Sequence, residues 1–254
     1  MATKRRKEWF DDEGFWRLLY PFMFGPERFV AAVSEVDQAL SLTRPRGKVA
    51  LDLCCGPGRF AIPLARRGYR VTGVDRTRFL LDKARARGRR AGLGVEWVLA
   101  DMRDFVRPET YHVVFNLFTS FGYFDARDED VAVLRNVYRS LRPGGVLLMD
   151  MTGKETLARV FQPTTSELLP DGSRLVQVHE VFDGFSRVRN EWILIRKGRA
   201  RSFRFHHTVY SGQELVDRLM AVGFAEVRLF GSLRGEEYGV DAMRLVAVAR
   251  KPGR

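Results

Sequence analysis

The sequence predicts a Rossmann-like α/β domain in which helices cover both faces of a parallel β-sheet. Through the middle of the chain, short apolar segments alternate with segments of helical periodicity, which is typical of βαβ units. The segment 146–149 is apolar without a break, as expected of a strand covered on both faces. A glycine-containing loop at 52–58 joins the first apolar segment to the first helix, where such sheets hold ligands. The 254 residues are 45% hydrophobic, enough for one large domain or for one domain with a small cap.

Residues 1–46 precede the alternating region and are predicted to form two helices. Aromatic residues cluster between Trp9 and Phe24, and a second apolar pattern with helical spacing runs from Phe29 to Leu40. Proline lacks a backbone N–H and disrupts the preceding helical turn. Pro21 and Pro26 are therefore expected to separate the two helices.

The central region is predicted to contain five strands and three helices. The strands are expected at 48–54, 69–75, 95–99, 111–117 and 146–151. The helices are expected at 58–67, 77–87 and 128–141. Pro63 falls inside the first of these helices, so a local distortion is expected there.

Residues 164–210 are predicted to form an antiparallel insert. Three strand patterns at 175–182, 188–195 and 202–210 are separated by turn dipeptides at 183–184 and 197–198. After the insert, Ser211 and Glu214 form a capping box that opens a helix ending at Gly223. Strands at 226–231 and 243–250 complete the chain.

The composition bears on location and partners. The two cysteines, Cys54 and Cys55, are adjacent and are not expected to pair, which favours the reducing cytoplasm. No apolar run approaches the roughly 20 residues of a membrane span, and the charged start of the chain is not followed by an apolar signal segment. The net charge is +12, and 36 of the 43 basic residues are arginines spread over every segment. We interpret this charge as a general arginine content rather than as a nucleic-acid site, which remains the alternative.

Carboxylates follow three successive strands at the expected ligand edge. Asp52 precedes the glycine loop, and Asp75 ends the second strand, where a carboxylate can accept both hydroxyls of a ribose or cap the next helix. Asp101 follows the third strand and is either an acceptor for an adenine amino group, with Met102 packed on the ring, or an ordinary loop acid. The pattern Gly56-x-Gly58 also fits a dinucleotide fingerprint, but that fingerprint does not explain Asp52 or Asp101.

With these residues the chain resembles the class I S-adenosylmethionine (SAM)-dependent methyltransferase superfamily. The segment 52–58 resembles the first motif of that family, and 141–145 resembles a later one. The resemblance covers roughly residues 48–250. It implies a seven-stranded sheet whose last strand is antiparallel, divided into an N-terminal helical lid (1–46), a core (47–163 and 211–254) and a capping insert (164–210). Cys54 replaces the usual first glycine, and Tyr111-His112 replaces a common aromatic-Asp pair.

The resemblance implies SAM as the cofactor, S-adenosylhomocysteine as the product, and a set of binding residues. Tyr20 and Arg28 of the lid are candidates for the methionine carboxylate, although lid packing and a surface charge would also explain them. The full implied set is Asp52, Cys54, Gly56, Gly58, Arg59, Asp75, Arg76, Asp101, Met102, Asn116, Tyr20 and Arg28. No motif demands a metal.

The methyl acceptor is expected beyond the fourth strand, where polar and aromatic residues mix between Asn116 and Phe124. Tyr123 is a candidate catalytic residue there. His206 and Tyr210 share one face of the last insert strand and are expected to line the pocket, His206 as a possible base, unless both are packing or surface groups. Nucleic-acid base methyltransferases commonly carry Asn/Asp-Pro-Pro-Tyr/Phe at this position, and the absence of that motif makes nucleic acid an unfavoured acceptor.

These observations favour a SAM-dependent methyltransferase that modifies a nitrogen or oxygen of a small molecule, mainly by holding the reactants in line. Three alternatives remain: methylation of RNA or protein, a nicotinamide-dependent oxidoreductase, and a SAM-binding scaffold without activity. The sequence does not predict an oligomeric state.

Overall fold

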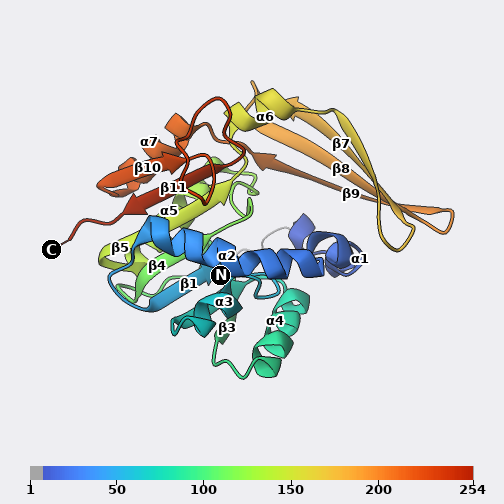
Figure 1. The fold of residues 1–254 in the computed structure, drawn as a ribbon. Coiled ribbons are helices and arrows are strands. Elements are labelled where there is room, and N and C mark those ends of the chain that lie inside the picture. Colours follow the sequence, from blue (N-terminus) through green and yellow to red (C-terminus); the bar gives the residue numbers. More distant parts are fainter. Residues whose placement is uncertain (1–7, 254) are drawn as a thin grey trace, which may run out of the picture.

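The computed structural model describes residues 8–253 and contains two β-sheets (Figure 1). The larger sheet has seven strands in the order β10-β11-β5-β4-β1-β2-β3, and the smaller has four in the order β6-β7-β8-β9. This confirms the predicted seven-stranded α/β fold with an antiparallel insert.

The first five strands of the larger sheet are parallel, and they are β1 (Val49–Leu53), β2 (Arg70–Asp75), β3 (Glu96–Leu99), β4 (Tyr111–Asn116) and β5 (Leu141–Met151). The last strand, β11 (Leu245–Arg250), pairs antiparallel both with β5 and with β10 (Glu226–Phe230). The carboxyl ends of the parallel strands therefore meet at one edge, as the glycine loop and the acids required.

Helices cover both faces of this sheet. On one face, Val114 and Leu147 pack with α5 (Arg127–Ser140) and α7 (Gly212–Val222). On the other face, Val113 and Val146 pack with α2 (Pro26–Thr43) and α3 (Ala61–Arg66). Neighbouring residues of a strand point to opposite faces, so each of these strands is buried on both sides. The predicted capping box is present, because the Glu214 N–H donates to Ser211 Oγ at 3.1 Å at the start of α7.

The prolines act differently from the prediction. Pro21 lies inside α1 (Glu13–Met23) and does not end it, whereas Pro26 begins α2. Pro26 occupies the first helical position, where a missing N–H leaves no hydrogen bond unmade. Pro63 is the third residue of α3, a helix shorter than expected, and an N–H there would have no partner within the helix either. The expected distortion of a longer helix around Pro63 is therefore wrong.

The smaller sheet contains β6 (Thr164–Leu168), β7 (Arg174–Phe182), β8 (Arg187–Arg196) and β9 (Arg199–Thr208). Both predicted turn dipeptides have positive φ, and Lys197-Gly198 forms a two-residue hairpin turn. Sequence reasoning missed two elements, the exposed and polar edge strand β6 and the short helix α6 (Lys154–Val160). It also ended α4 (Arg78–Arg90) three residues too early.

The smaller sheet arches away from the core and over α1 (Figure 1). Phe15 and Leu19 of α1 pack against Leu175 of β7 and Phe205 of β9, together with the short helix η1 (Trp9–Asp11). The N-terminal helices and the insert are thus packed on each other beside the carboxyl edge of the larger sheet. Within residues 8–253, no helix is long and apolar enough to cross a membrane.

Candidate active site

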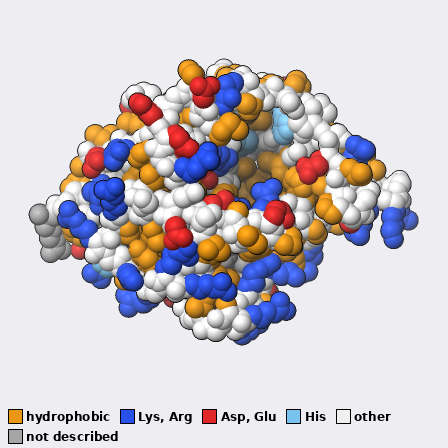
Figure 2. All heavy atoms as spheres, in the orientation of Figure 1, with side chains coloured by type: hydrophobic (Ala, Val, Ile, Leu, Met, Phe, Trp, Pro, Cys, Tyr) orange, Lys and Arg blue, Asp and Glu red, His pale blue; other side chains and the backbone are white. Residues whose placement is uncertain are grey.

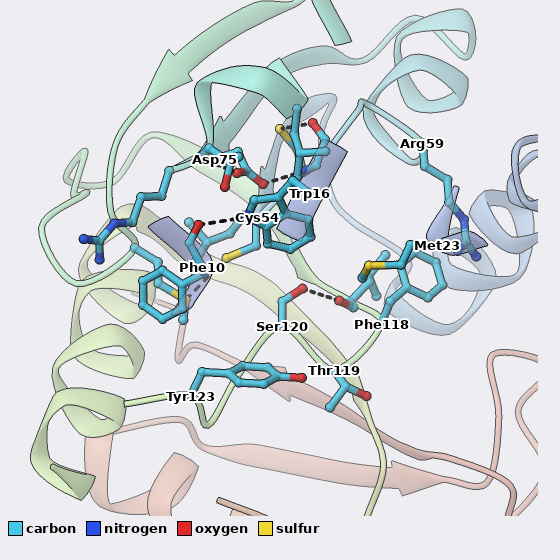
Figure 3. Close-up of a pocket in the computed structure, with 18 of the residues that line it drawn as sticks. Phe10, Trp16, Met23, Cys54, Arg59, Asp75, Phe118, Thr119, Ser120 and Tyr123 are labelled. Atoms are coloured by element: carbon cyan, nitrogen blue, oxygen red, sulfur yellow. Dashed lines mark hydrogen bonds between the residues drawn. The ribbon is translucent and has the colours of Figure 1, made fainter. Parts of the chain in front are cut away.

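A cavity of about 450 Å³ lies at the carboxyl edge of β1, β2 and β4. Its volume falls within the range of small-molecule sites. Figure 2 shows it as a hollow lined with hydrophobic side chains between the insert and the N-terminal helices. The close-up places Asp75 and Cys54 on one side of this space and Thr119 and Tyr123 on the other (Figure 3).

The glycine loop adopts left-handed backbone conformations. Gly56 and Gly58 have φ of 52° and 78°, and Cys54 has φ of 65° although it carries a side chain. Left-handed backbone is disfavoured for residues with a Cβ by roughly 1 kcal/mol or more. A Cβ on Gly58 would also lie 2.8 Å from Trp97. The loop therefore requires glycine at position 58, and Cys54 occupies a position that glycine would fill without strain.

Asp75 ties the glycine loop to the end of β2. Its Oδ2 accepts the Gly56 N–H and its Oδ1 accepts the Thr77 N–H, each at 2.8 Å. Thr77, rather than Asp75, is the N-cap residue of α4. Burial raises the pKa of Asp75, while hydrogen bonds from Thr77 and Gly56 oppose that rise. Each carboxylate oxygen keeps a second lone pair, so this cavity-lining side chain can still accept hydroxyl groups.

Asp52 presents an unpaired carboxylate oxygen. The side chain lines the cavity, and its Oδ2 is buried without a hydrogen-bond partner among residues 8–253. Burial raises the pKa of Asp52 to about 7, and a hydrogen bond from the Ala61 N–H partly opposes this rise. A buried carboxylate without a partner is costly, so this oxygen is suited to a positively charged ligand group.

Asp101 lies in a network of charges that reaches the N-terminal segment. Its Oδ2 is 2.6 Å from Arg76 Nη1 and 2.7 Å from Arg103 Nη2. Both arginines also bind Glu8, Arg76 Nη1 at 2.8 Å and Arg103 Nη2 at 2.7 Å. Burial opposes ionisation of Asp101, but the hydrogen bonds from Arg103 outweigh it and lower the pKa. Arg76 also pairs with Asp11.

Comparison with known proteins decides which family has this arrangement. A family model for a methyltransferase domain matches residues 50–145. The cypemycin N-terminal methyltransferase of a Streptomyces species is 30% identical over 208 residues, spanning 81% of this chain and 84% of that protein. The chain belongs to the class I SAM-dependent methyltransferases.

Solved structures of methyltransferases have the same fold. The CcbJ methyltransferase of Streptomyces caelestis aligns with a TM-score of 0.74 at 22% identity, covering 86% of this chain and 95% of that one. An amino pentose methyltransferase from Micromonospora echinaspora, solved with SAM bound, aligns with a TM-score of 0.69 at 22% identity, covering 99% of this chain and all of that one. The cofactor of this methyltransferase is SAM, and the unpaired Asp52 oxygen and the open lone pairs of Asp75 fit its cationic and ribose groups.

Most of the expected cofactor residues of this methyltransferase line one cavity, namely Asp52, Cys54, Gly56, Arg59, Asp75, Arg76, Asp101, Met102 and Arg28. Gly58 lies behind the loop, against Trp97. Arg59 is paired with Glu35 of α2 at 2.6 Å, and its guanidinium lies 3.6 Å from the centre of the Phe118 ring. Met102 contacts Cys54, with the two sulfur atoms 3.5 Å apart.

Besides Gly58, two expected cofactor residues lie outside the cavity lining. Asn116 is buried and donates through Nδ2 to the Leu53 carbonyl at 3.2 Å, which joins β4 to β1. Tyr20 packs its ring against Phe24 and Phe79, and its hydroxyl is buried without a partner in the described chain. Tyr20, a candidate for the methionine carboxylate, is thus packed within the N-terminal helices and against α4. Arg28 reaches the cavity.

Of the three catalytic candidates, Tyr123 lines the cavity and the other two do not. Burial raises the pKa of Tyr123 to about 12. His206 is instead directed to Asp125, with 3.1 Å between Nε2 and Oδ1. Tyr210 is buried in the core and donates to Asp130 Oδ2 at 2.5 Å. The expectation that His206 and Tyr210 line the pocket is wrong, because β9 turns its other face, with Phe203 and Phe205, toward the N-terminal helices.

Sequence reasoning missed part of the cavity wall. Trp192 of β8 and Gln177 of β7 line it from the insert and were not singled out, whereas Thr119 and Ser120 belong to the segment 116–124 where the acceptor was expected. Phe118 and Thr119 both have positive φ, 56° and 59°. Consecutive left-handed residues with side chains are strained, and such strain is found where surrounding structure holds a functional loop. The only sequence signal was the concentration of aromatic and hydroxyl residues at 116–124.

Proposed function

We propose that this SAM-dependent methyltransferase transfers the methyl group to the nitrogen of a small-molecule amine. The observation that carries the proposal is the chemistry of the cavity wall. Among residues 8–253, the ionisable acids that line the cavity are Asp52, Asp75 and Asp101, and no histidine lines it. Asp52 lies in β1, Asp75 ends β2 and Asp101 follows β3, and Figure 3 shows Asp75 on the side of the cavity opposite Thr119 and Tyr123.

An amine fits this wall better than an alcohol. A neutral amine attacks with its own lone pair, whereas a hydroxyl group needs a base to remove its proton during transfer. Tyr123, like any tyrosine, is protonated at neutral pH, and burial raises its pKa further to about 12, so it is not available as a base. Two of the similar proteins support this choice by name, an N-terminal methyltransferase and an amino pentose methyltransferase.

The protein's contribution is alignment and electrostatics. When bound, SAM supplies an electrophilic methyl group on a positively charged sulfur. Asp75 would hold the ribose, Asp101 and Met102 the adenine, and Asp52 the positive charge at the methionine end. Gly56, Gly58, Cys54, Arg59, Arg76 and Arg28 complete the proposed cofactor site. Holding both reactants in line can contribute roughly 7–11 kcal/mol.

The surrounding segments support a small acceptor. The described part of the proposed lid, residues 8–46, and the proposed cap, residues 164–210, enclose the cavity with Trp16 and Trp192. Two of the cavity-lining arginines, Arg59 and Arg76, are already paired with carboxylates, so the described wall has no open basic cluster for a polyanion. The two cysteines are unpaired, which agrees with the reducing cytoplasm that we propose as the compartment.

The test compares an amine and an alcohol that share one carbon skeleton, 2-phenylethylamine and 2-phenylethanol, each with SAM. We expect mass gain on the amine alone, together with release of S-adenosylhomocysteine. Asp75→Ala should abolish transfer and cofactor binding in calorimetry. Methylation of the alcohol without the amine would refute nitrogen as the acceptor.

A further inference from the structure

One wall of the cavity is built from aromatic side chains that come from three separate parts of the chain. Trp9 belongs to η1, Trp16 to α1, Trp192 to β8 and Tyr123 to the loop after β4, and all four line the cavity. The Trp9 ring centre lies 5.7 Å from that of Trp16 and 5.2 Å from that of Tyr123. We call these four residues the aromatic wall.

The aromatic wall is held in place by further rings. Phe15 packs 5.9 Å from Trp192, and Phe205 of β9 stacks on Trp9 at 4.6 Å. Phe205 also lies 5.5 Å from Trp192. The wall therefore exists only where the N-terminal segment and the insert meet, and it is rigid because its rings are packed from behind.

Three polar groups beside the aromatic wall are engaged within the protein, whereas Trp9 Nε1 and Trp192 Nε1 have no partner among residues 8–253. Ser120 Oγ donates to the Leu117 carbonyl at 2.7 Å, and Thr119 Oγ1 accepts from Arg244 at 3.1 Å. Trp16 Nε1 donates to the Phe10 carbonyl at 2.8 Å (Figure 3). The two unpartnered indole groups offer donors but no acceptor, so an acceptor molecule rich in hydroxyl groups would lose hydrogen bonds to water that this wall does not fully replace, which weakens binding.

The aromatic wall suits a cation that is formed by the reaction. Methyl transfer to a neutral amine moves the positive charge from the sulfur to the nitrogen. Aromatic faces attract such a charge, while the described wall on this side has no carboxylate that would hold a hydrated ammonium instead. Asp75 lies on the opposite side of the cavity (Figure 3), bonded to the glycine loop that Asp52 precedes.

We propose that the acceptor is an amine on an apolar, ring-bearing body, selected by the aromatic wall, rather than an amino sugar or another hydroxyl-rich amine. The inference rests on the proposed nitrogen methylation, but it concerns a different property of the acceptor. A flat ring buries apolar area against Trp16 and Trp192 and leaves its amine to be directed at the methyl group.

The four tryptophans of the chain make a direct binding test possible, because three of them belong to the aromatic wall and only Trp97 lies elsewhere. With S-adenosylhomocysteine present, 2-phenylethylamine and D-glucosamine are titrated against the full chain by tryptophan fluorescence. We expect the ring amine to bind at least tenfold more tightly and to have the larger kcat/KM with SAM. Equal or tighter binding of glucosamine, or no fluorescence change with either amine at millimolar concentration, would overturn the inference.

Variants separate a specificity role from general damage. Trp192→Ala should lower kcat/KM for 2-phenylethylamine about tenfold, Trp192→Phe should restore most of it, and calorimetric binding of S-adenosylhomocysteine should stay within twofold. Phe185→Ala, in an exposed turn of the same insert, is the matched control and should change neither. An unchanged kcat/KM in Trp192→Ala contradicts the inference.

The two proposals fail in different ways. Faster transfer to the amino group of glucosamine, located by fragmentation in mass spectrometry, than to 2-phenylethylamine would leave nitrogen methylation intact and remove the aromatic acceptor. Transfer to 2-phenylethanol, with binding that depends on Trp192, would keep the aromatic acceptor and remove the nitrogen.

Discussion

Arg76 and Glu8 lie 68 positions apart in the chain, yet Arg76 Nη1 is 2.8 Å from Glu8 Oε2. Arg76 follows β2 at the cofactor edge, and Glu8 precedes η1 of the N-terminal segment. The same arginine binds Asp11 at 2.8 Å and Asp101 at 2.6 Å. These ion pairs therefore hold the N-terminal segment against the end of the cavity where we place the adenine.

We predict that the ion pairs of Glu8 and Asp11 slow the release of S-adenosylhomocysteine. In Glu8→Gln with Asp11→Asn, the release of S-adenosylhomocysteine measured by stopped flow should be about three- to tenfold faster, because losing these partly exposed ion pairs removes roughly 1 kcal/mol in total. The wild-type rate should rise with salt, and the variant rate should depend on salt less. Glu13→Gln, which breaks only an exposed pair with Arg17, is the control. Equal release rates in all three proteins would show that the ion pairs do not hold the segment closed.

Asp52 predicts a pH dependence of SAM binding. Its pKa is raised to about 7 in the free protein, and a cationic ligand binds the ionised form. The dissociation constant of SAM should therefore rise about tenfold as pH falls from 7.5 to 6, because the proton on Asp52 must be displaced. Asp52→Asn should bind SAM more weakly, with little pH dependence over this window. A parallel pH dependence in both proteins would assign it to another group.

The raised pKa of Asp52 also predicts how the free energy of unfolding changes with pH. A carboxyl whose pKa is raised on folding binds a proton in the native state between pH 4 and 7 that the unfolded chain has released. The free energy of unfolding then decreases as pH rises through that window. Asp52→Asn lacks this titration, so its stability relative to the wild type should be greater at pH 8 than at pH 5. Urea unfolding at the two pH values measures the difference, and a constant difference would contradict the raised pKa.

Cys54 shows how far the sequence could predict the loop. The motif placed a turn at 52–58 and identified position 54 as the place of a usual glycine, and the structure gives Cys54 a φ of 65°. Three strand-end acids and the glycines were predictable because each depends on a few neighbouring residues and on one rule of sheet geometry.

Positions set by distant contacts were not predictable in the same way. Strand alternation placed His206 on one face of β9, but the contact of Phe205 with Phe15, 190 positions away, decides which face meets the cavity. The Arg103–Glu8 pair joins residues 95 positions apart and has no local signal. The polar edge strand β6 was missed because four of its five residues are exposed and it carries no apolar alternation.

The left-handed conformation at position 54 leads to a further prediction. Cys54→Gly should be about 1 kcal/mol more stable than Cys54→Ala, because alanine keeps a Cβ at a φ of 65° and glycine does not. Both variants lose the contact with Met102, so their comparison isolates the backbone effect. Thermal unfolding of the two purified variants measures it. A more stable alanine variant would show that the loop relaxes out of this conformation.

Arg244 supports the strained acceptor loop and should affect turnover more than cofactor binding. Its Nη2 is 3.1 Å from Thr119 Oγ1 and its Nε is 2.7 Å from Asp150 Oδ1, whose carboxylate also accepts the Phe118 N–H through Oδ2. Arg244→Lys keeps one charge near Asp150 but cannot bind both partners with a planar fork.

We expect Arg244→Lys to lower kcat for 2-phenylethylamine about tenfold while the dissociation constant of SAM changes less than twofold, because a misplaced acceptor loop disturbs alignment without touching the cofactor acids. Arg234→Lys, with an exposed side chain paired to Glu236, is the control. A kcat that is unchanged while KM rises would instead mean that the loop binds the acceptor equally in the ground state and the transition state.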